Sequence, residues 1–226
     1  MSYLIVVAHP DDEVLGAGAT IVKLTTEGQK VAVCILSGDA GARNNRPELS
    51  ELYTDTENCL NLLGVDDVTI GNFPNIEFNT VPHLHMVQFI ENVILRVKPH
   101  TVMTHHPSDL NNDHIQTSQA CQAASRIFQR RSDIPPIRQL LFMEVLSSTE
   151  WNVDPNVSFR PNLFVEVQKE GISKKIEALS RYSGVMRSFP HPRSEESIFG
   201  LAAYRGVQSG MQYAEAFECV FRRGLQ

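Results

Sequence analysis

Closely spaced cysteines are missing from this sequence. Its four cysteines, at positions 34, 59, 121 and 219, are far apart, and no two form a Cys-x-x-Cys motif. This spacing argues against a disulfide framework. The mostly apolar neighbours of these residues predict buried, reduced thiols. We therefore expect a protein of the cytoplasm.

Long apolar runs and an excess of positive charge are also missing. No stretch approaches the length of a membrane span, and the amino-terminal apolar run stops at Ala8 with no basic region before it, too short for a signal peptide. The net charge of −6 argues against a nucleic-acid surface or a face for anionic membranes. We expect a small molecule as the partner.

Two common phosphate-binding signatures do not occur either. The chain has neither Gly-x-x-x-x-Gly-Lys nor Gly-x-Gly-x-x-Gly, and no internal repeat, low-complexity tract or linker divides it. Its composition, 42% hydrophobic and 20% charged, is ordinary for a globular protein. The sequence predicts one domain over residues 1–226.

The first 36 residues have the pattern of a strand, a helix and a second strand. Residues 4–8 form a continuous apolar run, residues 13–27 have helical apolar spacing closed by Gly28, and residues 31–36 form the next apolar run. This unit predicts a right-handed crossover and a ligand site at the carboxyl ends of the strands. We expect an α/β, Rossmann-like three-layer fold with a mostly parallel sheet.

Strands and helices alternate along the rest of the chain. A glycine-rich polar loop covers residues 37–47. Apolar runs predict strands at 68–70, 101–104, 140–145 and 163–167, and helical spacing predicts helices at 48–63, 83–97, 114–130, 172–182 and 197–221.

The first strand runs directly into His9, Asp11, Asp12 and Glu13. Acidic residues after a proline also cap helices, where a carboxylate contributes about 0.5 to 1 kcal/mol. A cap explains one aspartate. It does not explain two aspartates beside an imidazole at the end of an apolar strand. A divalent metal site explains all three residues.

A second polar cluster, Thr-His-His-Pro-Ser-Asp-Leu-Asn-Asn-Asp-His at residues 104–114, follows another apolar segment. Taken alone, it is equally well explained by a turn before a helix, because Asn and Asp are common turn residues. Carboxyl ends of parallel strands converge on one crevice, however. Two nitrogen ligands and one oxygen ligand from the two clusters would match a catalytic zinc that keeps an open position for water.

These motifs resemble those of the PIG-L/LmbE-like zinc-dependent N-acetylglucosaminyl de-N-acetylases. The resemblance rests on Ala-His-Pro-Asp-Asp-Glu at residues 8–13 and Asn-Asp-His at residues 112–114. It extends through residues 147–151, 159–162, 190–194 and 214–217, and so over nearly the whole chain. It implies a hydrolase that removes the N-acetyl group of an amino sugar or glycoconjugate and releases acetate and a free amine.

The resemblance also implies a role for each motif residue. His9, Asp12 and His114 would hold zinc, and Asp11 would be the general base that takes a proton from the attacking water. Asp113 would orient an imidazole or the acid group of the site. The family further implies a homo-oligomer, with assemblies up to hexamers.

Some positions depart from the family pattern. A histidine of other members is Asn111 here, which donates a hydrogen bond but no proton, so the identity of the acid stays open. His191 is our preferred substitute, and a solvated loop histidine is the alternative. An arginine and an aspartate that often contact the sugar fall at Leu52 and Asn75.

Substrate contacts are expected from polar and aromatic residues around the crevice. Arg43 in the polar loop is a candidate to replace the missing arginine, and Trp151, the single tryptophan, either stacks on a sugar ring or lies partly buried. The full expected set is Arg43, Asn75, Asn111, Trp151 and Arg193. Which N-acetylated compound they bind stays open.

Two other functions fit part of the sequence. A doubly wound glycosyltransferase or phosphatase would hold magnesium against a phosphate, but it would need a phosphate cradle. A non-catalytic sugar-binding module would be expected to lose the base, yet Asp11 is present with all three expected ligands. We therefore predict a metal-dependent deacetylase.

Overall fold

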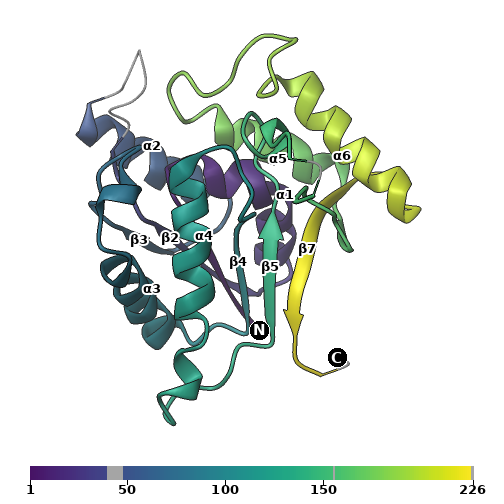
Figure 1. Cartoon of the computed structure of the whole chain (residues 1–226). Coiled ribbons are helices and arrows are strands. Elements are labelled where there is room, and N and C mark those ends of the chain that lie inside the picture. The colour runs from purple at the N-terminus through teal and green to yellow at the C-terminus, as the bar shows by residue number, and fades with distance from the viewer. Residues whose placement is uncertain (40–47, 155, 225–226) are drawn as a thin grey trace.

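A computed structural model describes residues 1–39, 48–154 and 156–224. Its centre is a seven-stranded sheet with the strand order β3-β2-β1-β4-β5-β7-β6 (Figure 1). Every strand pair from β3 to β5 is parallel, and β7 runs antiparallel to both β5 and β6. The strands are β1 (Ser2–Val7), β2 (Lys30–Ile35), β3 (Asp67–Ile70), β4 (Thr101–His105), β5 (Gln139–Met143), β6 (Leu163–Glu166) and β7 (Ala214–Arg222).

Helices cover both faces of this sheet. One face carries α1 (Asp12–Thr26), α2 (Leu49–Leu62), α5 (Lys169–Leu179) and α6 (Glu195–Ser209). The other face carries α3 (His83–Val97) and α4 (Asn112–Ala124), as Figure 1 shows. Short 3-10 helices cover Phe78–Thr80, Ile127–Gln129 and Thr149–Trp151. The expected three-layer α/β fold with a mostly parallel sheet is confirmed.

Strand β1 shows why its sequence is apolar throughout. Neighbouring side chains of a strand point to opposite faces. Ile5 and Val7 accordingly pack into the core beneath α1 and α5, whereas Leu4 and Val6 pack into the core beneath α3 and α4. A central parallel strand with both faces covered needs apolar residues at every position.

The strand order reverses direction between β1 and β4. From β1 the chain continues on one side to β2 and β3, and it returns to the other side at β4 and β5. Ligands of doubly wound sheets bind outside the carboxyl ends of the strands at such a reversal. The first polar cluster follows β1 and the second follows β4, so the topology brings both clusters to this point.

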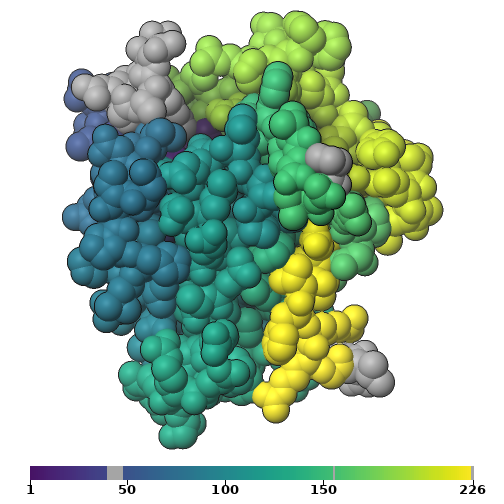
Figure 2. All heavy atoms as spheres, viewed as in Figure 1, coloured from purple at the N-terminus to yellow at the C-terminus, as the bar shows by residue number. Residues whose placement is uncertain are grey.

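The expected helix over residues 197–221 is wrong in its second half. Helix α6 ends at Ser209, where Gly210 adopts a left-handed conformation (φ 74°), and β7 follows from Ala214. Glycine ends helices readily in this conformation because it has no Cβ. Strand β7 pairs with β6 only along Ala214–Phe217, and Val220 and Phe221, beyond that stretch, are exposed. Figure 2 shows the yellow strand near the carboxyl end of the chain at the surface of the molecule.

Other predicted elements are confirmed with shifted ends. The helix expected over residues 114–130 begins at Asn112 and gives way after Ala124 to the 3-10 helix Ile127–Gln129. The strand expected over residues 140–145 ends at Met143. Within the described residues, no helix combines the length and apolar character needed to span a membrane.

Helix α1 is broken at Ala17, where the backbone leaves helical geometry (φ −145°, ψ 15°). The break frees backbone groups inside the core. Glu215 of β7 accepts the N–H groups of Ala19 (3.1 Å) and Thr20 (2.6 Å), and Lys175 of α5 donates to the carbonyl of Leu15 (2.8 Å). Lys175 and Glu215 also pair with each other at 2.7 Å. This buried pair therefore supplies hydrogen-bond partners for the backbone groups that the break in α1 leaves unpaired.

We predict that Lys175→Met destabilises the protein by about 3 to 5 kcal/mol, because it leaves Glu215 as an uncompensated buried charge. Urea unfolding measures the change. The control is Arg181→Met, because the Arg181–Glu177 pair (3.1 Å) is exposed and a pair of this kind contributes about 0.5 kcal/mol. Equal stability of the two variants would contradict a role for the buried pair.

Candidate active site

The turn between β1 and α1 positions the first motif. Asp11 precedes the helix in a left-handed conformation (φ 105°), and α1 begins at Asp12. The backbone N–H of His9 donates to Asp12 Oδ2 at 2.9 Å, which closes the turn. Asp11 and Asp12 therefore point their carboxylates to different places although they are neighbours in the sequence.

Three buried side chains from the two motifs form a candidate metal site. Asp12 Oδ2 lies 3.4 Å from His9 Nδ1 and 3.3 Å from His114 Nε2. One ligand atom from each of the three residues lies within 4.8 Å of the others. Two imidazole nitrogens and one carboxylate oxygen are a common protein donor set for catalytic zinc. The residues present therefore fit a divalent cation.

A carboxylate behind His9 fixes the orientation of that ring. Asp113 is fully buried, and its Oδ2 lies 2.9 Å from His9 Nε2. The same carboxylate accepts the backbone N–H groups of Ile76 (2.6 Å) and Phe78 (3.0 Å). With Nε2 held by Asp113, the Nδ1 atom of His9 faces Asp12. Asp113 thus lies where it can orient the His9 imidazole.

A second carboxylate does the same for His114. Asp109 Oδ1 lies 3.1 Å from His114 Nδ1, so that Nε2 faces Asp12. Asp109 also accepts hydrogen bonds from Ser148, Thr149 and the backbone of Asn111. Burial raises the pKa of Asp109, but His114 and the other donors outweigh burial and lower it to about 2. Sequence reasoning missed this residue, because an aspartate before Leu-Asn-Asn is also typical of a turn.

His105 belongs to the frame of the site and not to its ligands. It is fully buried, its Nε2 accepts the backbone N–H of Ala8 (2.9 Å), and its ring stacks on His114 at 3.9 Å between centroids. Burial lowers the pKa of His105 to about 3, so the ring is neutral. His105, Asp109 and His114 also lie close enough to hold an ion. The orientations show instead that Asp109 and His105 support His114 from behind.

The expected base, Asp11, lies beside an arginine. Arg193 Nη1 is 3.4 Å from Asp11 Oδ2, and Arg193 Nε donates to Ser147 Oγ at 2.8 Å. Asp11 lines the same cavity as the three candidate metal ligands. A carboxylate on the cavity wall beside a metal site, and not among its ligands, can accept a proton from water.

Glu13 and Tyr182 hold the backbone of Asp11. The Asp11 N–H donates to Glu13 Oε2 (3.1 Å), and the Tyr182 hydroxyl donates to Glu13 Oε1 (2.6 Å). Glu13 is fully buried, and burial raises its pKa to about 8. A non-glycine residue at φ 105° is strained by about 1 to 3 kcal/mol, and such a residue persists where its surroundings fix it. Tyr182 was not expected from the sequence, where a tyrosine at the end of a helix has no distinguishing signal.

A cavity of about 600 Å³ contains these groups. Of the residues expected to contact substrate, Asn75, Asn111 and Arg193 line it. Asn75 donates to the carbonyl of Asp39 (2.7 Å), and Asn111 caps α4 by accepting the N–H of Asp113 (2.9 Å). The remaining described walls include Ile76, Leu110, Asn112, Val145, Ser147, Ser148, Ser183, Gly184 and Arg187.

Three expected residues are not on the described wall of this cavity. Trp151 is 59% exposed in a 3-10 helix. His191 is exposed, and its Nδ1 accepts the backbone N–H of Arg193 (3.0 Å). Burial and the charges of Arg193 and Arg187 lower the pKa of His191. Arg43 lies outside the described residues.

The match of the chain to a known family decides its membership. The family model described as PIG-L, GlcNAc-PI de-N-acetylase, matches residues 4–125. The chain belongs to the PIG-L family. The family expected from the motifs is therefore confirmed. The expected class of enzyme, a deacetylase, is confirmed with it, because the family model is described as a de-N-acetylase.

Two curated relatives of the chain carry deacetylase names. The uncharacterized deacetylase YaiS of Escherichia coli is 28% identical over 77% of this chain and 86% of its own length. A probable N-acetyl-alpha-D-glucosaminyl L-malate deacetylase 2 of Bacillus anthracis is 28% identical over 80% of this chain and 79% of its own. The fold also occurs in GalB, a 4-carboxy-2-hydroxymuconate hydratase of Pseudomonas putida (22% identity, TM-score 0.78, covering 100% of this chain and 98% of GalB).

We predict that Tyr182→Phe lowers kcat about tenfold and leaves KM within about twofold, because Glu13 loses a donor and holds Asp11 less firmly. Metal content should not change. The control is Tyr213→Phe, since the Tyr213 ring packs edge-on against Phe199 and its hydroxyl bonds to none of the described residues.

Steady-state kinetics in an Asp11→Asn background separate a positioning role from general damage. If Tyr182 acts through Asp11, Tyr182→Phe costs little further activity once the base is gone. The same tenfold loss in both backgrounds would disprove that role.

Proposed function

We propose that this PIG-L protein is a zinc-dependent deacetylase that hydrolyses the N-acetyl group of an amino sugar or glycoconjugate. The products are acetate and a free amine. The observation that carries the proposal is the buried cluster of His9, Asp12 and His114 with a further carboxylate, Asp11, on the same cavity wall. The deacetylase names of its relatives support the choice of reaction.

His9, Asp12 and His114 would hold the zinc ion. When bound, zinc lowers the pKa of water and polarises the acetyl carbonyl. Asp113 and Asp109 fix the two imidazoles, so that His9 presents Nδ1 and His114 presents Nε2. Ligands held by hydrogen-bonded carboxylates need little rearrangement to bind a cation.

Asp11 acts as the general base. Its carboxylate takes a proton from the attacking water, and the neighbouring Arg193, at 3.4 Å, helps to hold that carboxylate in place. The amide nitrogen must gain a proton before it leaves, and Asp11 can return the proton it has taken. His191 stays a predicted acid, although its place outside the described wall makes Asp11 the better-supported donor.

Asn111 supports the developing oxyanion. Its Oδ1 is occupied by the N–H of Asp113, so its amide nitrogen is the group left for substrate. One such donor contributes about 3 to 4 kcal/mol when it faces the oxyanion. Asn75 and Arg193 are the other proposed contacts on the described wall, and Arg43 and Trp151 stay predictions.

Replacing His9, Asp12 or His114 with Ala should lower zinc content and activity together. We expect about one zinc per chain in the wild-type protein and a large loss in each variant, because three protein ligands hold a catalytic zinc. Elemental analysis after dialysis measures the metal. A full complement of zinc in all three variants would rule out this ligand set.

Asp11→Asn should keep its zinc and lose activity by roughly 10²-fold or more, the usual scale for a general base. Acetate release from N-acetylated sugars measures turnover, and elemental analysis confirms the metal. Near-normal turnover with zinc present would mean that another group activates water. A metal-loaded protein that releases no acetate from any N-acetylated sugar would count against the deacetylase itself.

A further inference from the structure

The chain between β5 and β6 contains a tight turn at residues 147–150 that reaches two parts of the candidate active site. Its two serines, Ser147 and Ser148, both line the cavity. They are neighbours in the sequence, yet their hydroxyl groups have different partners. Ser147 Oγ accepts a hydrogen bond from Arg193 Nε, and Ser148 Oγ donates to Asp109. The turn therefore contacts the residue beside the proposed base and the residue behind a candidate metal ligand.

On the side of the base, Ser147 is the second contact of Arg193. The guanidinium group lies 3.4 Å from Asp11 Oδ2 through its Nη1 atom, and its Nε atom donates to Ser147 at 2.8 Å. A free arginine side chain samples many rotamers. Two contacts made through different nitrogens of a planar group restrict it to one position. Ser147 thus fixes the arginine that lies against the proposed base.

On the side of the metal site, Ser148 and Thr149 hold Asp109. The Ser148 hydroxyl donates to Asp109 Oδ1, and the Thr149 hydroxyl donates to Asp109 Oδ2 at 2.7 Å. Asp109 Oδ1 in turn lies 3.1 Å from His114 Nδ1. All four residues are buried. The two hydroxyl groups therefore fix the carboxylate that orients His114.

The backbone of the turn is strained and is held by a third side chain. Ser147 adopts a left-handed conformation (φ 74°), which is unfavourable for a residue that has a Cβ atom. The Glu150 carboxylate accepts the backbone N–H groups of Ser147 (2.6 Å) and Ser148 (3.1 Å). Strained residues of this kind persist where their surroundings fix them, and they cluster at functional sites. Glu150 therefore holds both serines in the positions from which they reach the site.

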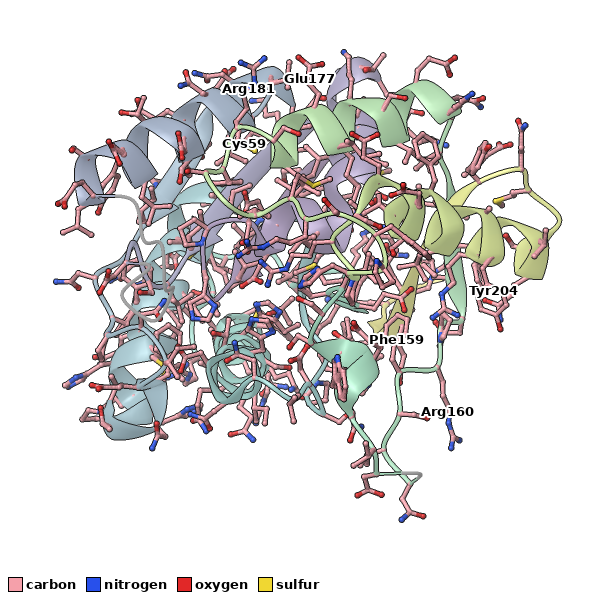
Figure 3. All side chains as sticks on the ribbon, turned by 90° about the horizontal axis from the view of Figure 1, so that it is seen from above. Cys59, Phe159, Arg160, Glu177, Arg181 and Tyr204 are labelled. Carbon is pink, nitrogen blue, oxygen red and sulfur yellow. The ribbon has the colours of Figure 1, made fainter. Side chains whose placement is uncertain are left out.

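Arg205 of α6 anchors the chain before and after this turn. It donates to both carboxylate oxygens of Glu144, at 2.7 and 2.6 Å. Its guanidinium carbon also lies 5.6 Å from the centroid of the Phe159 ring and 5.4 Å from that of Tyr204, and Figure 3 labels both aromatic residues. The turn thus extends from a fixed base, as a group that positions an active site requires.

We propose that the turn at residues 147–150 is a positioning element for both halves of the site. Ser147 acts on the proposed base through Arg193, and Ser148 acts on a proposed zinc ligand through Asp109. The inference rests on the deacetylase function and the zinc ligands proposed above. It requires that two adjacent serines have separable effects, one on turnover and one on the retention of zinc.

Ser147→Ala should lower kcat about fivefold, leave KM within about twofold and leave the rate of zinc loss unchanged, because it removes one hydrogen bond on the side of the base. Alanine strains the left-handed backbone as serine does, so the variant removes the hydroxyl alone. In an Arg193→Met background, Ser147→Ala should cost little further activity, since the contact is already gone. Acetate release from N-acetylated sugars measures kcat and KM.

Ser148→Ala should instead release zinc to a chelator about tenfold faster than the wild type, because groups that hold a ligating histidine in place contribute about 10- to 100-fold to metal affinity or activity. The matched control is Ser180→Ala, because the Ser180 hydroxyl donates to the carbonyl of Ile176 in its own helix (2.9 Å). This control should change neither kcat nor the rate of zinc loss.

Glu150→Ala should combine the two effects in one variant, because it frees the backbone of both serines. Glu150→Gln keeps one acceptor oxygen of the pair and should restore part of each loss. General damage to the fold predicts no such partial rescue.

Equal rates of zinc loss in Ser147→Ala and Ser148→Ala, or the same loss of kcat from Ser147→Ala with and without Arg193, would overturn the proposal. If the wild type holds zinc and releases acetate while both serine variants match it, the reaction stands and the positioning role is wrong. A zinc-loaded wild type that releases no acetate would overturn the reaction and the base side of the turn, and the rate of zinc loss would still decide the metal side. A wild type that holds no zinc would overturn both proposals.

Discussion

The Asp12 carboxylate is the group on which the rest of this site depends. It is buried, and its Oδ2 lies within 3.5 Å of ring nitrogens of His9, His105 and His114. Burial would raise the pKa of Asp12, but the imidazoles, His114 foremost, hold it well below its usual range. A buried anion of this kind requires positive charge beside it. A proton shared among the histidines or a divalent cation can supply that charge.

Two further carboxylates, Asp109 and Asp113, contact the histidines that surround Asp12. Burial lowers the pKa of His114, but Asp12 and Asp109 outweigh it and raise it to about 10, so without a cation the ring holds a proton between two anions. Binding a cation displaces such a proton. Asp113 ties His9 to the loop at Ile76 and Phe78, and Asp109 ties His114 to the 3-10 helix at Thr149. Loops of the cavity are thereby joined to the same charge network.

The sequence predicted the parts of this arrangement that depend on strand ends. His9 and Asp12 follow β1, His114 follows β4, and a parallel sheet brings such ends together whatever the details of packing. Asp109 and Tyr182 were not predicted. Their roles come from the approach of loops distant in the sequence, and nothing in their local patterns separates them from turn, core or surface residues.

The prediction for the residues of β7 was wrong for a related reason. Residues 197–221 have enough apolar residues at helical spacing to resemble one helix, and only Gly210 marks the change. Ala214–Phe217 becomes a strand because the sheet offers partners on both sides, β5 and β6. The pairing also places Glu215 where the broken α1 needs an acceptor. Tertiary context decided this element, as it often does for strands.

The candidate metal ligands and the side chains that support Asp11 come from different parts of the chain. The match to the PIG-L family covers residues 4–125, which include Asp11 and the three candidate ligands. Tyr182, which donates to Glu13, and Arg193, which lies beside Asp11, come from outside it. The hydratase GalB shares the fold, so the fold alone does not fix the reaction. Because the candidate metal ligands and the proposed base all lie in the first half, residues of the second half such as Arg193 can differ without changing that cluster.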